Sequence, residues 1–150
     1  MDIIDLLIKD HDGFRRELVE IRHALSQNGL REKIKLFISR YELHESIEEE
    51  ILFPALEGLP EDVLSAKLMP NYEKMHERIW ILLDQLMDSM GHSQFSELQQ
   101  AFFMFAASVE THLGHEERVL FPTIREMMNR AVLESLGKAA EQRIAKFIEV

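Results

Sequence analysis

The sequence predicts an all-α fold, an up-down-up-down antiparallel four-helix bundle followed by a short extra helix at the C-terminus. Four long stretches repeat apolar residues at alternating spacings of three and four, which is the pattern of helices that bury one face. The breaks between these stretches are short, so neighbouring helices should run antiparallel. No stretch has the two-residue alternation that is typical of a strand.

The first two helices are expected at residues 3–27 and 30–57, separated by the stop signal Asn28-Gly29. The inward positions of the first are Leu7, His11, Phe14, Leu18, Ile21 and Leu25. Those of the second are Ile34, Phe37, Tyr41, His44, Glu48, Ile51 and Ala55. Pro54 should distort or end the last turn of the second helix, because proline has no N–H to donate.

The third helix is expected to start near Pro60 and to run to about Met90, with a start or a kink at Pro70. Its inward positions are Met69, Tyr72, His76, Ile79, Leu83, Leu86 and Met90. Ser93 is the expected N-cap of the fourth helix, which should span about Gln94 to Asn129. The inward positions of the fourth are Leu98, Phe102, Phe105, Val109, His112, Glu116, Val119 and Thr123.

Residues 131–150 predict a shorter amphipathic tail helix, interrupted at Gly137 and packed outside the bundle. The 150 residues are expected to form one domain, with a core bundle over about 3–129 and the tail over about 131–150. The exposed tail helix could also pack on a second copy of the chain, which would give a homodimer.

Charge and composition exclude several classes of function. The net charge of −10 makes nucleic acid and anionic membrane surfaces poor partners. The lack of cysteine excludes disulfides, thiolate metal sites and iron–sulfur clusters. The N-terminus has no basic region before an apolar run, and no apolar run approaches the ~20 residues of a spanning helix. We therefore expect a soluble, cytoplasmic protein.

One segment occurs twice in nearly the same form. The stretch from His44 to Pro54 returns from His112 to Pro122 as H-x3-E-E-x2-L-F-P, so that His44 matches His112 and Glu48 matches Glu116. In each copy the His and the Glu are four residues apart and share one face of a helix. His11 precedes the first copy and His76 the second, each on an inward face. An approximate two-fold relation between the helix pairs would bring all six residues into one layer.

A carboxylate on an apolar helix face costs several kcal/mol unless it is paired or coordinated. A His–Glu hydrogen-bond network is one solution, and a pair of metal ions, as found in other helical bundles, satisfies all six groups at once. Nitrogen and oxygen ligands suit Fe, Mn or Zn. In the metal interpretation His11 and His44 bind one ion, His76 and His112 bind the other, and Glu48 and Glu116 bridge them.

The remaining candidates have weaker signals. His115 lies about one turn from His112 and is either an extra ligand or a group that supports a ligand. Glu49 and Glu117 should face outward, because each is rotated roughly 140° from its histidine. His23 and His92 should be solvated. Phe53, Phe102, Phe105 and Phe121 should belong to the core.

These features resemble the hemerythrin-like family, also called the HHE cation-binding domain. The resemblance covers about Asp5 to Arg125 and rests on Lys9-Asp10-His11-Asp12, the two repeated segments and Met75-His76-Glu77. It implies that the chain is a single hemerythrin-like domain with a non-haem pair of iron ions joined by an oxo or hydroxo bridge. It also implies that dioxygen or another small diatomic such as NO binds at an open position. Zn or Mn could substitute for iron.

One position of this chain differs from the oxygen-carrying hemerythrins. Those proteins have a second histidine on the third helix, four residues from the one that matches His76. Here Tyr72 stands four residues before His76, and Trp80 stands four residues after it. Tyr72 should line the vacated position or bind the metal through its phenolate oxygen. Glu73 could reach in and form an E-x2-H pair with His76.

Three roles follow from these alternatives. The favoured role, which is not enzymatic, is the binding or sensing of O2, NO or iron itself. The second is a redox enzyme that reduces peroxide or NO, or supplies iron for the repair of iron–sulfur clusters. The third is a structural or partner-binding bundle with an incidental metal. The absence of cysteine weakens a repair role that needs thiol chemistry, and the sequence indicates no particular redox partner.

Overall fold

The computed structural model describes residues 1–59, 69–92 and 94–149, and every regular element in these residues is helical. The first rod is α1 (Ile3–His23) and the third is α5 (Met69–His92). The second is built from α2 (Leu30–Ile47), the π-helical turn η1 (Glu48–Leu52) and α3 (Phe53–Ala55). The fourth is built from α6 (Phe95–His115), the π-helical turn η2 (Glu116–Leu120) and α7 (Phe121–Met127), and α8 (Arg130–Glu149) follows it.

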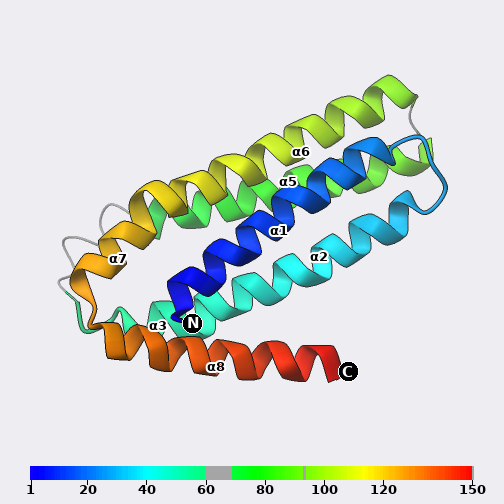
Figure 1. Ribbon diagram of the computed structural model, residues 1–150. Coiled ribbons are helices and arrows are strands. Elements are labelled where there is room, and N and C mark those ends of the chain that lie inside the picture. Colours follow the sequence, from blue (N-terminus) through cyan, green and yellow to red (C-terminus); the bar gives the residue numbers. More distant parts are fainter. Residues whose placement is uncertain (60–68, 93, 150) are drawn as a thin grey trace.

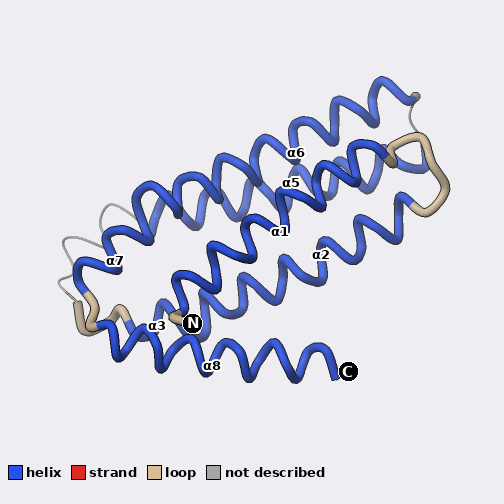
Figure 2. Tube along the Cα trace, viewed as in Figure 1, coloured by secondary structure: helices blue, strands red, loops and turns tan. Residues whose placement is uncertain are grey.

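The four rods run up, down, up and down, with the described loops at the two ends (Figures 1 and 2), which confirms the predicted bundle. The turn between α1 and α2 contains Gly29 at φ 91°, a left-handed conformation that glycine adopts without strain. The last helix, α8, lies outside the four rods and packs on α1, α2 and η1 (Figure 1). No helix in the described part of the chain is both long and apolar enough to cross a membrane.

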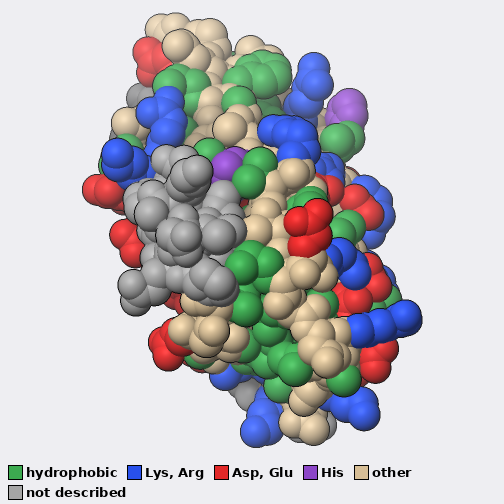
Figure 3. All heavy atoms as spheres, turned by 90° about the vertical axis from the view of Figure 1, so that its left-hand side faces the viewer, with side chains coloured by type: hydrophobic (Ala, Val, Ile, Leu, Met, Phe, Trp, Pro, Cys, Tyr) green, Lys and Arg blue, Asp and Glu red, His purple; other side chains and the backbone are tan. Residues whose placement is uncertain are grey.

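Two clusters of buried apolar side chains make up the core, one toward each end of the bundle. The larger cluster lies between α1, α2, α5 and α6 and includes Phe14, Phe37, Ile79, Phe102 and Val109. The second lies where α8 meets the bundle and includes Ile3, Leu7, Ile47, Leu52, Leu120, Phe121, Ile124, Leu133 and Ala140. The end of the molecule that contains α3 and α7 carries side chains of both charges, with apolar side chains between them (Figure 3).

Two predictions, one about where the first helix ends and one about a break in the tail helix, were wrong. The first helix ends at His23 rather than Gln27, because the N–H of Ala24 bonds to the carbonyls of both Glu20 and Ile21 and so tightens the last turn. The tail helix is not interrupted at Gly137. A Cβ at Gly137 would lie 2.2 Å from the carbonyl oxygen of Met1, so glycine allows the N-terminal backbone to approach α8 closely.

Both repeated segments contain a π-helical turn that begins at the glutamate. The N–H of Phe53 bonds to the carbonyl of Glu48 and that of Phe121 to the carbonyl of Glu116, five residues earlier in each case. The wider turn contains one extra residue, so the inward face beyond it moves by one position. The buried residues there are Leu52, Leu56, Leu120 and Ile124 rather than the predicted Ile51, Ala55, Val119 and Thr123.

The prolines that follow these turns have different outcomes. The second rod ends at Ala55, directly after Pro54, whereas Pro122 lies in the first turn of α7, which continues to Met127. The predicted helix start near Pro60 and the predicted cap at Ser93 lie outside the described residues. In the described part, α5 begins at Met69, and Gln94 precedes α6.

Candidate metal centre

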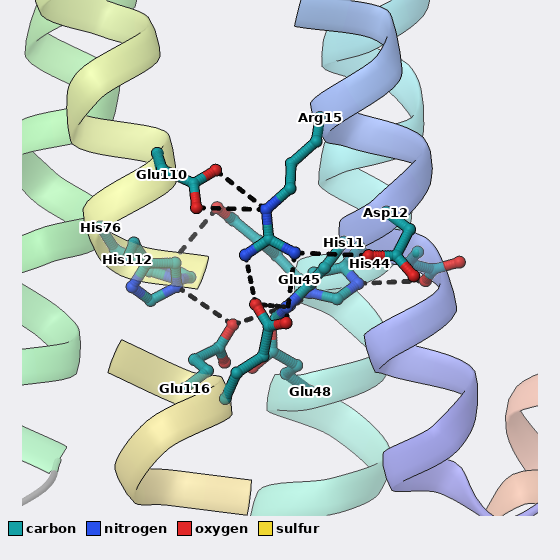
Figure 4. Close-up of polar contacts among 12 residues, drawn as sticks. His11, Asp12, Arg15, His44, Glu45, Glu48, His76, Glu110, His112 and Glu116 are labelled. Carbon is teal, nitrogen blue, oxygen red and sulfur yellow. Dashed lines mark hydrogen bonds and ion pairs between the residues drawn. The ribbon is translucent and has the colours of Figure 1, made fainter. Parts of the chain in front are cut away.

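All six predicted ligand residues lie in one buried layer between the two apolar clusters. They come from all four rods, with Glu48 and Glu116 each at the first position of a π-helical turn (Figure 4). Between 0 and 7% of the surface of each residue is exposed. The six residues are His11, His44, Glu48, His76, His112 and Glu116.

The first half of the layer contains His11 and His44, whose ring centroids lie 5.0 Å apart. The Nε2 atom of His11 is 3.1 Å from Oε1 of Glu116. The Nε2 atom of His44 is 2.8 Å from Oε1 of Glu48. His11, His44 and Glu116 each offer one ligand atom, and these atoms all lie within 4.8 Å of one another.

The second half contains His76 and His112, whose Nε2 atoms lie 3.1 Å apart. The Nε2 atom of His112 is 3.6 Å from Oε1 of Glu116. Glu48, His112 and Glu116 form a second group of ligand atoms within 4.8 Å of one another. Glu116 therefore belongs to both groups, and Glu48 contacts His44 in one half and joins His112 in the other. This is the placement that bridging carboxylates need.

The spacing of these atoms fits the coordination of a metal ion. Ligands about 2.0–2.2 Å from one ion and at right angles to each other lie about 3 Å apart. Several atoms at this spacing make no hydrogen bond of acceptable geometry with any described residue: Nε2 of His11, Nε2 of His44 and both carboxylate oxygens of Glu48 and Glu116. Buried polar atoms seldom stay without partners. A hydrogen-bond network leaves them unsatisfied, whereas a cation supplies what they lack.

Burial prepares three of the imidazoles to bind a cation. Burial, with the nearby His44, lowers the pKa of His11 to about 4. It lowers the pKa of His76 to about 4 and that of His112 to about 3. These three rings are therefore neutral at pH 7, which is the form that offers a lone pair to a metal. Burial also depresses the pKa of His44, but Glu48 and Asp10 outweigh it and raise this pKa to about 9.

The two central carboxylates cannot both be ionised without a cation nearby. Burial raises the pKa of Glu48, but the charge of His44 outweighs it and holds that pKa well below the ordinary value. Burial and the charge of Glu48 raise the pKa of Glu116 well above its ordinary value. A positive ion between the two carboxylates would remove the repulsion that keeps a proton on Glu116.

Three acidic residues that the sequence did not reveal as part of the site lie beside the outer nitrogens of the histidines. His44 Nδ1 donates to Asp10 at 3.0 Å, and His11 Nδ1 donates to Glu117 at 3.3 Å. His76 Nδ1 lies 3.5 Å from Oε1 of the buried Glu45. A carboxylate on the outer nitrogen fixes the orientation of the ring, so that its Nε2 lone pair points inward.

The prediction that Glu117 faces outward was therefore wrong. His11 and Arg15 both donate to the Glu117 carboxylate, which draws this side chain half-buried against His11. Glu49 is exposed, as predicted, although its Oε1 is 3.8 Å from His76 Nδ1. Each of these acidic residues is a chain neighbour of a predicted ligand, but Asp10 and Glu117 contact histidines on other rods, which no local signal indicates.

Tyr72 lines the second half of the layer, as expected. Its ring centroid is 3.9 Å from that of His76 and 5.1 Å from that of His112. Its hydroxyl is buried, with no hydrogen-bond partner among the described residues. Burial and the charge of Glu48 raise the pKa of Tyr72 well above its ordinary value, so the side chain is a neutral phenol.

The other two weaker candidates do not join the layer. Glu73 is exposed rather than turned toward His76, and the carboxylate that approaches His76 is that of Glu45 from α2. A step of three residues leaves Glu73 rotated by about 60° from His76, toward the outside of the bundle. His115 is half-buried, and no group of closely spaced ligand atoms in the described chain includes it.

A family model described as the hemerythrin HHE cation binding domain matches residues 2–124 and matches again over residues 68–147. The first match contains all six residues of the buried layer. The second match contains His76, His112 and Glu116. In the sequence these three residues repeat the arrangement of His11, His44 and Glu48. No curated protein and no solved structure matches the chain.

Proposed function

The chain belongs to the family of hemerythrin HHE cation-binding domains, and from that premise we propose that its buried layer of histidines and glutamates holds a pair of iron ions. We further propose that this pair binds dioxygen or another small diatomic such as NO. The observation that carries the proposal is Glu116, whose carboxylate belongs to both groups of ligand atoms and makes no hydrogen bond with a described residue.

In this proposal each half of the layer supplies two imidazoles. His11 and His44 hold one ion, His76 and His112 hold the other, and Glu48 and Glu116 contact both. Because the donors are nitrogen and oxygen only, Zn and Mn could replace iron in a given preparation. When bound, an iron pair supplies redox chemistry and affinity for diatomic ligands, whereas the chain controls access, orientation and protons.

The side chains around the layer restrict what reaches it. The ring of Phe121 stacks on His11 with centroids 5.5 Å apart, and Phe14 lies edge-on to His44 at 5.2 Å. Tyr72 covers His76 and His112, where its neutral hydroxyl is available to donate a hydrogen bond to a ligand. These contacts favour a small ligand and exclude bulk water from the layer.

A second candidate is a redox enzyme that reduces peroxide or NO, and Glu45 is the observation that favours it. The side chain of Glu45 is buried, and its Oε1 makes no hydrogen bond with a described residue. A third carboxylate beside His76 would give the site the harder, more anionic ligand set that suits oxidised iron.

We propose that the described elements act as one domain, with a small diatomic or peroxide as its partner.

The test is to purify the protein anaerobically, load it with Fe(II), and record metal content and optical spectra before and after exposure to air or NO. Two irons per chain and a spectrum that reverts when the gas is removed are the expected results. A firm value of one iron, with all six residues intact, would reject the metal pair. Sustained peroxide consumption with an electron donor would favour the enzyme instead.

A further inference from the structure

The two halves of the metal layer have equivalent histidines, but their outer nitrogens are held unequally. In the first half, both histidines donate their Nδ1 protons to carboxylates, at 3.0 Å for His44 and 3.3 Å for His11. In the second half, Nδ1 of His112 is buried without a hydrogen-bond partner among the described residues. Nδ1 of His76 lies 3.5 Å and 3.8 Å from the oxygens of Glu45 and Glu49, which is too long for strong bonds.

The carboxylate that holds His11, that of Glu117, is itself fixed by a charged network that joins α1 to α6 and η2. Arg15 contacts both oxygens of Glu117, with Nη1 donating to Oε1 at 3.1 Å and Nη2 donating to Oε2. The same guanidinium donates through Nε to Glu110 at 2.9 Å (Figure 4). A carboxylate held by a two-pronged guanidinium has little freedom to turn, so it fixes the His11 ring behind it.

The second half is oriented less firmly. The Nε2 atoms of His76 and His112 lie 3.1 Å apart, a spacing that two ligands of one ion can have, but neither ring has a close carboxylate on its outer nitrogen. His76 is also missing from the group that Glu48, His112 and Glu116 form, and it groups instead with Glu45 and Glu49. The His76 ring must therefore settle into place when an ion enters.

Resting on the proposed metal pair, we infer that the two positions fill in a fixed order. The position between His11 and His44 binds first and retains its ion, because its ligands are already oriented and little ordering remains when the ion enters. The position between His76 and His112 binds second, more weakly, and exchanges its ion. At limiting metal the main species is a singly loaded chain, which a second, different metal could complete.

The test is a calorimetric titration of the metal-free full chain with Co(II), with the visible absorption of bound Co(II) recorded alongside. Two steps whose affinities differ by tenfold or more are expected. His11→Ala should remove the tight step and His76→Ala the weak one. Two ions bound with equal affinity, or loss of the tight step in His76→Ala, would overturn the order while leaving the pair intact. Binding of one ion or none by the unaltered chain would reject the pair itself.

A matched pair of variants tests why the first position is tight. Glu117→Ala removes the carboxylate behind His11, and Glu110→Ala removes a contact of the same Arg15 that touches no histidine. Glu117→Ala should weaken the first step by roughly 10–100-fold, the usual effect of losing such a partner. Glu110→Ala should change it by less than about threefold. Equal weakening in both variants, with unchanged circular dichroism, would show that the network only holds the helices together and would overturn this explanation.

Discussion

Glu116 lies against His11 across the bundle, with its Oε1 3.1 Å from the Nε2 of that histidine, although the two residues come from the fourth and first rods. The same oxygen is 3.6 Å from Nε2 of His112. Glu116→Ala should therefore lower the occupancy of both metal positions, whereas His11→Ala should chiefly empty one. Elemental analysis after iron loading measures this, and the loss of a single ion in both variants would contradict a bridging role.

Tyr72 should affect how long a bound O2 is retained, because it takes the position that a histidine holds in the oxygen-carrying members of the hemerythrin-like family. Tyr72→His would place an imidazole one turn from His76 on the same helix face. The decay of the oxygenated spectrum should then be slower than in the unaltered protein. Tyr72→Phe is the control, since it keeps the ring but loses the hydroxyl that could donate to the ligand, and it should decay faster. Unchanged decay in both variants, with iron still bound, would mean that Tyr72 only packs.

Glu45 should make the metal-free protein less stable as the pH rises. Burial and the charge of Glu48 raise its pKa to about 8 from the model-compound value of 4.5. Between these pH values the folded chain holds a proton that the unfolded chain releases, so the free energy of unfolding falls with rising pH. Glu45→Gln removes this loss and should melt at a higher temperature than the unaltered protein at pH 8, with little difference at pH 4.5. Melting curves in the presence of a chelator would show it, and a constant difference across this range would exclude the ionisation of Glu45 as the cause.

Metal should raise the melting temperature, because it binds atoms that only the folded chain brings together. At a free concentration of a hundred times Kd, one bound ion adds about 2.7 kcal/mol to the free energy of unfolding. Differential scanning calorimetry with Zn(II), which has no redox chemistry, avoids oxidation during heating. His23, exposed and far along α1 from the layer, provides the control: His23→Ala should keep the full shift. The absence of any shift at saturating Zn(II) would mean that the folded bundle does not form the site.

Gly137 should be intolerant of a side chain, because the backbone of Met1 lies where its Cβ would stand. Gly137→Ala should lower the free energy of unfolding by about 1–3 kcal/mol, the usual cost of overpacking. Gly91→Ala is the matched control, since a Cβ there meets nothing within 4 Å and alanine favours the helix. Urea denaturation compares the two, and equal stability of both variants would show that α8 shifts freely.

The bundle and the six residues of the layer could be predicted from the sequence because they depend on short-range regularities. The spacing of apolar residues predicts the rods, and the recurrence of a His and a Glu one turn apart predicts the shared depth of the layer. The charged partners could not be predicted in this way. Asp10 lies 34 residues from His44, and Glu117 lies 106 residues from His11, so only the packing of the rods brings them together.

The inward face beyond each glutamate was missed for a different reason. A constant helical period assigns Val119 to the core, yet 38% of its surface is exposed and Leu120 is buried instead. The apolar residues at the shifted positions were visible in both repeats as the shared Leu-Phe-Pro, but a period of 3.6 has no place for an added residue. The continuity of α8 was missed because the close approach of Met1 to Gly137 is a tertiary contact.

The π-helical turns let the buried layer and the second apolar cluster change separately. Deleting one residue from the turn after Glu116 would return that rod to a uniform helix. Leu120 and Ile124 would then take the places three and seven residues after Glu116, which face inward in a uniform helix, so both would stay in the core. The loss or gain of one residue at this turn is therefore absorbed within the turn, and the packing of α8 on the bundle does not depend on it.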